Sequence, residues 1–98
     1  MQEREVLGEL WDVIGERAEN PSAESYVSRI LTHRKGVDKA LEKVGEEAVE
    51  FIIAAKNGDD ARTVSEGADL LFHFLLALKA ANIDLADVLA ELEERRRG

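Results

Sequence analysis

Apolar residues recur at steps of three and four from Val37 to Ala55, and this spacing constrains the fold more than any other feature. An α-helix turns once every 3.6 residues, so residues with this spacing share one face that can be buried. Asn57-Gly58 follows the stripe and predicts the end of a helix at about Lys56. The stripe consists of Val37, Ala40, Leu41, Val44, Ala48, Phe51, Ile52 and Ala55.

Four other segments are predicted to be helical, and their limits follow from residues that start or stop helices. Asn20-Pro21 ends the first, because the residue before a proline avoids helical backbone angles. Ser25 and Asp84 are suitable N-caps, and Gly36 suits a helix C-terminus. The four segments run from about Glu3 to Glu19, Tyr26 to His33, Asp60 to Ala81 and Leu85 to Arg96.

These segments predict an all-α fold, an antiparallel bundle of about five helices in one domain spanning residues 1–98. The chain has one proline and is rich in helix-favouring residues. The stretch from Ala68 to Leu78 is apolar nearly all round, so we expect a homodimer that covers it. Val88, Leu89 and Leu92 are expected to face the core. The expected dimer interface draws on the fourth and first predicted helices and includes Leu71, Phe74, Leu75 and Leu78.

The charge and composition exclude several classes of protein. A net charge of −8 argues against a general nucleic-acid binder, because phosphate backbones need Lys and Arg to neutralise them. There is no cysteine, so disulfides and thiolate metal sites are excluded. The longest apolar run is too short for a membrane span, and we recognise no signal peptide, so a cytoplasmic protein is expected. A phosphorylated small substrate is compatible with this charge if a metal ion or basic cluster reverses the local field.

Five acidic residues on two consecutive helices are the strongest candidates for chemistry. Glu46, Glu47 and Glu50 lie within about one turn, and Glu66 and Asp69 repeat the three-residue spacing on the next helix. Antiparallel packing of these helices would bring the two groups face to face. Carboxylate oxygens are the ligands that Mg²⁺ prefers, and Mg²⁺ also binds substrate phosphates. The first three acids alone would be interpreted as a solvated helix face, but the matched pair Glu66 and Asp69 favours a metal site.

Basic residues precede this acidic cluster at steps of four. Lys43 lies one turn before Glu46 and Glu47, where its ammonium could meet a phosphate held by Mg²⁺. For Lys35 and Lys39, ordinary pairing with nearby acids explains the spacing slightly better. Arg34 is a weaker phosphate candidate, and we include both Arg34 and Lys35 among the predicted substrate contacts.

His73 follows Asp69 by four residues and so lies on roughly the same helix face. It is a candidate for bonding a phosphate or ribose, or for orienting a metal-bound carboxylate. A histidine on an apolar face is often a core residue with satisfied hydrogen bonds, and both interpretations stay open.

The pattern E-E-x-x-E, fifteen residues, then E-x-x-D resembles the metal-binding motif of the all-α nucleotide pyrophosphohydrolases, the MazG-like superfamily. The flanking residues resemble one branch, the phosphoribosyl-ATP pyrophosphohydrolases of histidine biosynthesis. Phe72 is one departure, because that family commonly has a tyrosine there. The resemblance extends from about Ser25 to Arg95. It is carried by Ser25-Tyr26, Lys43–Glu50, Glu66–His73 and Asp87–Leu92.

The resemblance implies Mg²⁺-dependent hydrolysis of phosphoribosyl-ATP to phosphoribosyl-AMP and pyrophosphate. It also implies that Glu46 is a candidate base that orients the attacking water. A housecleaning pyrophosphatase for non-canonical nucleoside triphosphates is an alternative, because it would share the acids. A non-catalytic helical interaction module is a second alternative. The metal ligands implied by the resemblance are Glu47, Glu50, Glu66 and Asp69.

Overall fold

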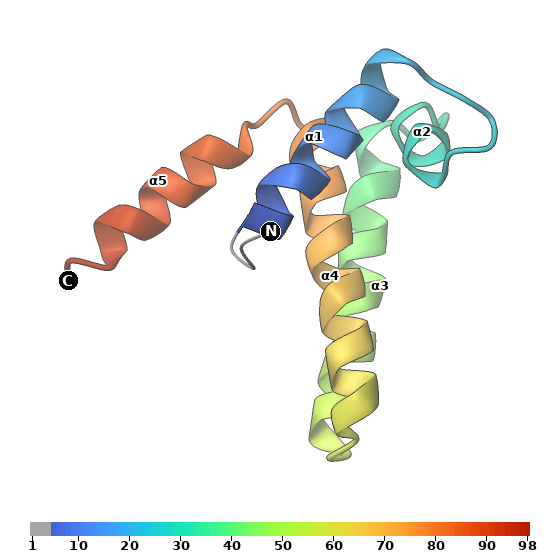
Figure 1. Ribbon diagram of the computed structural model, residues 1–98. Helices are drawn as coiled ribbons and strands as arrows, with labels where there is room; N and C mark the ends of the chain where they lie inside the picture. Colours follow the sequence, from blue (N-terminus) through green and yellow to red (C-terminus); the bar gives the residue numbers. More distant parts are fainter. Residues whose placement is uncertain (1–4) are drawn as a thin grey trace.

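The computed structural model describes residues 5–98, which form helices and no strand. The all-α prediction is confirmed. The helix predicted from the apolar stripe between Val37 and Ala55 begins and ends at the predicted residues. The other described helix ends differ from the prediction by two residues at most, and the predicted start at Glu3 lies outside the described residues. The helices are α1 (Val6–Glu19), α2 (Tyr26–Leu31), α3 (Val37–Lys56), α4 (Asp60–Ala80) and α5 (Leu85–Arg95) (Figure 1).

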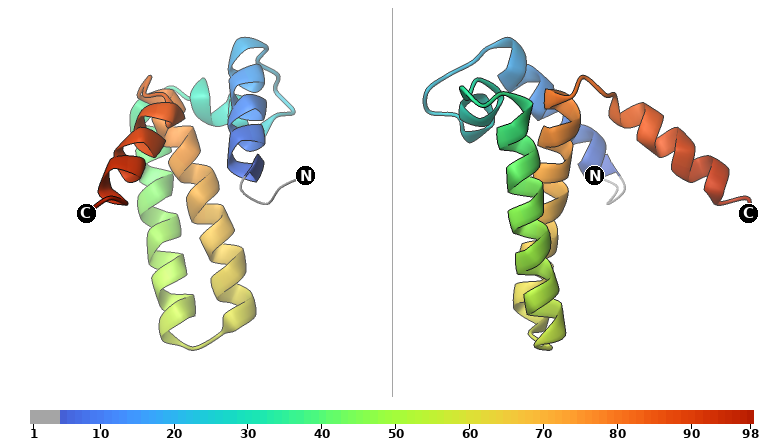
Figure 2. Two further views of the ribbon diagram at one scale, coloured as in Figure 1. Left: turned by 60° about the vertical axis from the view of Figure 1, so that its left-hand side comes forward. Right: turned by 180° about the vertical axis from the view of Figure 1, so that it is seen from behind.

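Helices α3 and α4 are the longest of the described helices and form an antiparallel hairpin (Figures 1 and 2). Gly58 has a positive φ of 71° and closes α3, where its N–H donates to the Ala55 carbonyl at 3.1 Å. The Asp59 N–H donates to the Ala54 carbonyl at 3.2 Å, which completes a Schellman motif. The Asp59 carboxylate then caps α4 by accepting from the Arg62 N–H at 3.0 Å. This tight turn keeps α3 and α4 adjacent along their length.

Helices α1 and α2 pack on only one end of the hairpin, opposite the Gly58 turn (Figure 1). Ser25 caps α2 as predicted, because its hydroxyl accepts from the Ser28 N–H at 3.2 Å. The hydrophobic core lies at this covered end, while the hairpin tip at Gly58 extends beyond α1 and α2. The buried core residues are Ile14, Val27, Ile30, Ala40, Leu75, Leu76, Ala77 and Leu85.

Gly36 does not end the second helix, so that prediction was wrong. Helix α2 ends earlier, at Leu31, and Gly36 is the residue immediately before α3. Its φ of 62° and ψ of −136° are accessible to glycine but strained for a residue with a Cβ. Gly36 therefore sets the direction in which α3 leaves the preceding loop.

Helix α5 projects away from the hairpin (Figures 1 and 2). The prediction that Leu89 and Leu92 face the core was wrong, because their side chains are exposed, while Val88 is half-buried. Only Leu85, at the start of α5, is buried. The turn at Asn82, with a φ of 59°, directs α5 outward from the end of α4.

Helix α4 is also less buried than its composition predicts. His73, Leu75, Leu76 and Ala77 are buried, whereas Leu71 is 52% exposed. Leu75 is 1% exposed, so the prediction that it lies in a dimer interface was wrong. Among the described residues, no helix is both long enough and apolar enough to span a membrane.

Candidate metal and substrate site

Three carboxylates from the two hairpin helices converge. One oxygen each from Glu47 of α3 and from Glu66 and Asp69 of α4 lies within 4.8 Å of the other two. The three-residue spacing puts Glu66 and Asp69 on one face of α4, and the antiparallel hairpin places Glu47 opposite them. We call these three residues the carboxylate trio.

The three members of the carboxylate trio differ in exposure. Glu47 and Glu66 are half-buried, and Asp69 is exposed. Asp69 lies in an apolar stretch of the sequence, yet its side chain is exposed. The closeness of three like charges, and not the burial of one, therefore favours a bound cation.

The geometry of the carboxylate trio fits a small, hard cation. Mg²⁺ binds oxygen at about 2.0–2.1 Å, so two oxygens on one ion lie at most about 4.2 Å apart. The oxygens of the trio are already within 4.8 Å of one another, so small side-chain rotations suffice. All the donors are carboxylate oxygens, which is the donor type that Mg²⁺ prefers.

The fourth predicted ligand, Glu50, is not one of these converging residues. Its carboxylate lies 3.8 Å from Nη2 of Arg62, and the same guanidinium lies 3.2 Å from Oε1 of Glu66. Arg62 thus links Glu50 to a member of the carboxylate trio across the hairpin. A cation bound by Glu66 would compete with Arg62 for this carboxylate.

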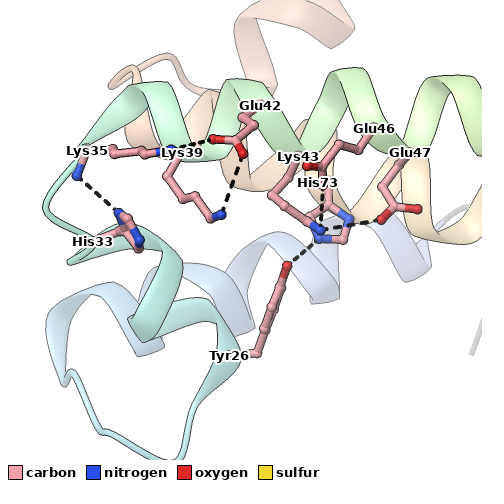
Figure 3. A network of polar contacts seen from close by, with 9 residues as sticks. All are labelled: Tyr26, His33, Lys35, Lys39, Glu42, Lys43, Glu46, Glu47 and His73. Carbon is pink, nitrogen blue, oxygen red and sulfur yellow. Dashed lines mark hydrogen bonds and ion pairs between the residues drawn. The ribbon is translucent and has the colours of Figure 1, made fainter.

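Lys43 and Glu46 lie beside Glu47, the member of the carboxylate trio that Figure 3 shows. The Lys43 ammonium donates to Oε2 of Glu46 at 2.9 Å and lies 3.8 Å from Oε1 of Glu47. The hydrogen bond to Glu46 raises the pKa of Lys43 and outweighs the effect of partial burial. Lys43 therefore carries a positive charge at neutral pH, next to the proposed ligands.

The other predicted basic contacts lie nearer the loop before α3. Lys35 and Lys39 both pair with Glu42, at 3.2 and 3.8 Å (Figure 3). The hydrogen bond from Lys35 lowers the pKa of Glu42. Arg34 is exposed on the same loop, and within residues 5–98 no ion pair joins Arg34 or Lys35 to the carboxylate trio. Both residues are separate from the acidic centre in this arrangement.

His73 is 7% exposed, and both of its ring nitrogens have partners. Nδ1 lies 2.8 Å from the Asp69 carbonyl oxygen, and Nε2 lies 2.8 Å from the Tyr26 hydroxyl (Figure 3). Tyr26 was not predicted among the site residues. It contacts His73 across 47 positions of sequence, so no local pattern indicates the pair.

The sequence of the whole chain is similar to those of known proteins. The family model described as phosphoribosyl-ATP pyrophosphohydrolase matches residues 7–96. A phosphoribosyl-ATP pyrophosphatase of Methanoculleus marisnigri is 66% identical over 99% of this chain and 100% of its own length. Proteins of the same name from Methanosphaerula palustris and Methanocorpusculum labreanum are 58% and 59% identical. These two alignments cover 99% and 100% of this chain, and 98% and 95% of the relatives.

Proposed function

This chain belongs to the phosphoribosyl-ATP pyrophosphohydrolase family, and we propose that the carboxylate trio is the centre at which it performs the family's reaction. The chain is a hydrolase that cleaves phosphoribosyl-ATP to phosphoribosyl-AMP and pyrophosphate in histidine biosynthesis. The observation that carries the metal assignment is the convergence of three carboxylate oxygens within 4.8 Å between α3 and α4.

Glu47, Glu66 and Asp69 would hold Mg²⁺, with Glu50 as a fourth ligand. A Mg²⁺ ion bound there would neutralise triphosphate charge and would help to orient a water for in-line attack. The acidic residues alone would repel a triphosphate, so substrate binding should require the cation. Arg62 pairs with both Glu50 and Glu66.

Lys43 is proposed to bind a phosphate next to the metal. Its ammonium opposes the charge of the polyphosphate and of the departing pyrophosphate. Glu46 accepts a hydrogen bond from Lys43 and is the candidate base for the attacking water. Arg34 and Lys35 would contact more distant parts of the substrate.

His73 is proposed to act by orientation. Both of its ring nitrogens are already engaged inside the chain, so it orients neighbouring groups and need not contact a phosphate directly.

The test is product analysis with phosphoribosyl-ATP, with and without Mg²⁺. We expect equal amounts of phosphoribosyl-AMP and pyrophosphate, and loss of both products when the metal is chelated. A panel of ordinary and modified nucleoside triphosphates tests the housecleaning alternative, which predicts faster turnover of a modified triphosphate. Full activity in excess chelator would refute the metal centre. Family membership argues against the non-catalytic module.

We also propose that the enzyme is a homodimer with a nucleotide substrate. Apolar side chains on the uncovered part of the hairpin support this proposal: Val49, Ile52 and Ile53 of α3 are at least half exposed. On α4, Leu71 is 52% exposed and Val64 is 75% exposed. Two such hairpins packed together would form a four-helix bundle and bury these residues.

Light scattering at micromolar concentration tests the dimer. We expect a mass near twice that of the 10.9 kDa chain. A monomer with full activity would refute the dimer without affecting the metal assignment. Cytoplasmic location and the absence of nucleic-acid binding stay predictions from the sequence.

A further inference from the structure

The hydrogen bonds of His73 fix the direction in which the Tyr26 hydroxyl donates. The Asp69 carbonyl oxygen can only accept, so Nδ1 of His73 carries a hydrogen. In the neutral ring Nε2 is then an acceptor, and the Tyr26 hydroxyl must donate to it at 2.8 Å. The phenolic oxygen keeps its lone pairs and can accept a further hydrogen bond.

The Tyr26 oxygen lies within electrostatic reach of Lys43. Burial raises the pKa of Tyr26 most, and the nearby charge of Lys43 partly opposes that rise. Figure 3 shows the Tyr26 hydroxyl directed toward the region where the Lys43 and His73 side chains end. Tyr26 is 37% exposed, so its hydroxyl lies at the edge of the site and not deep in the core.

A neutral hydrogen-bond acceptor beside Lys43 affects the charge of its ammonium differently from a carboxylate. In the structure Lys43 donates to Glu46 and lies near Glu47, and both acids offset its charge. Glu47 is a proposed metal ligand and Glu46 the proposed base, so both have other roles once metal and substrate bind. A phenolic oxygen can hold an ammonium hydrogen without cancelling its charge, which leaves that charge available to a phosphate.

We propose that Tyr26, fixed by His73, is a positioning residue that holds the Lys43 ammonium beside the substrate phosphate. This inference rests on the proposed function of Lys43. It also gives the hydrogen-bond chain from Asp69 through His73 to Tyr26 a role beyond joining α2 to α4.

A double-mutant cycle of Tyr26→Phe and Lys43→Met tests this inference. Tyr26→Phe keeps the ring, and we expect it to lower kcat/KM about tenfold, which is about 1.4 kcal/mol. In the Lys43→Met background the same change should lower kcat/KM less than twofold, because the group that it positions is gone. Thr32→Val is the matched control: it deletes a hydroxyl that bonds the Ser28 carbonyl, and it should keep kcat/KM within twofold.

The outcomes separate this inference from the proposed function. If Lys43→Met lowers kcat/KM strongly but Tyr26→Phe does not, or if the two losses multiply, Tyr26 does not act through Lys43. If Lys43→Met itself stays within twofold, the proposed role of Lys43 and this inference both fail. His73→Gln is a second variant should Tyr26→Phe fold poorly. It removes the imidazole that fixes the hydroxyl. The loss of kcat/KM that it causes should also vanish in the Lys43→Met background, and a loss that persists there overturns the inference.

Discussion

One apolar stripe on α4 has two different environments along its length. Val64, Ala68, Leu71 and Leu75 follow at steps of three and four, so they share one face of the helix. Leu75 is 1% exposed and belongs to the core that includes Ile14 of α1. Val64, near the hairpin tip, and Leu71, at the middle of the helix, are 75% and 52% exposed.

The difference between these two halves shows that an apolar stripe in the sequence does not indicate which element buries it. In the covered half, α1 and α2 bury the stripe within one chain. In the bare half, which includes residues 60–71 of α4, no other helix within residues 5–98 covers the stripe. The carboxylate trio lies in this half, on another face of the same hairpin. The proposed metal site and the proposed dimer interface thus share the half that contributes least to the core, where elements can adjust with less effect on global stability.

The largest expected effect comes from the carboxylate trio in the bare half. Glu47→Gln or Asp69→Asn removes one ligand charge and little volume. Turnover of phosphoribosyl-ATP should fall by at least about three orders of magnitude, about 4 kcal/mol, in a steady-state assay with Mg²⁺. Without metal, the melting temperature should stay equal or rise, because like charges within 4.8 Å repel in the parent.

Glu94→Gln is the control for this prediction, because it makes the same chemical change on exposed α5. It should leave turnover and melting temperature near those of the parent. Glu50→Gln tests the fourth ligand, and we expect it also to abolish turnover. Near-normal Mg²⁺-dependent activity in Glu47→Gln or Asp69→Asn would refute the metal assignment.

The second prediction compares equal truncations in the two halves of the stripe. Leu75→Ala opens a cavity in the core and should lower the free energy of unfolding by about 2–5 kcal/mol. Leu71→Ala removes an exposed side chain and should cost the monomer less than about 0.5 kcal/mol. Urea unfolding at low protein concentration measures both. Equal losses would show that the two halves are covered alike within one chain.

Sequence patterns predicted helices well because their signals are local. The Asn57-Gly58 stop ends α3, and Ser25 and Asp84 cap their helices, as predicted. Gly36 was recognised as a helix boundary but assigned to the wrong helix. The spacing of the acids also brought Glu47, Glu66 and Asp69 together once α3 and α4 formed a hairpin. Their convergence could be predicted from the sequence because a single short turn connects the two helices.

Burial was harder to predict because it depends on how helices meet. Leu89 and Leu92 have inward spacing, yet the turn at Asn82 directs α5 away from the core. The apolar neighbours of Asp69 gave no indication of which side of α4 is covered. The Tyr26–His73 contact joins residues 47 positions apart, so no local pattern specifies it.

The third prediction concerns association through the bare half. Leu71→Asp places a charge in the proposed dimer interface, and desolvating that charge is costly. The dimer dissociation constant should rise at least tenfold, about 1.4 kcal/mol, while circular dichroism of the monomer stays unchanged. Sedimentation over a concentration series measures the constant, with Leu92→Asp on exposed α5 as a matched control. Unchanged dimerisation of the Leu71→Asp variant would show that the dimer interface lies elsewhere.

The smallest expected effects come from removing one helix cap in each of the two halves. Ser25→Ala and Asp59→Ala each remove a side-chain acceptor at a helix N-terminus, a change that costs about 1 kcal/mol. Helix α2 contributes Val27 and Ile30 to the core, so Ser25→Ala should lower the melting temperature by about 4–8 °C. Asp59 caps α4 at the uncovered tip, where helix ends can open without unfolding the core. Asp59→Ala should therefore speed amide hydrogen exchange near residues 60–63 and change the melting temperature less. A melting shift in Asp59→Ala as large as in Ser25→Ala would mean that the tip unfolds together with the core, and that the bare half is not an independent unit.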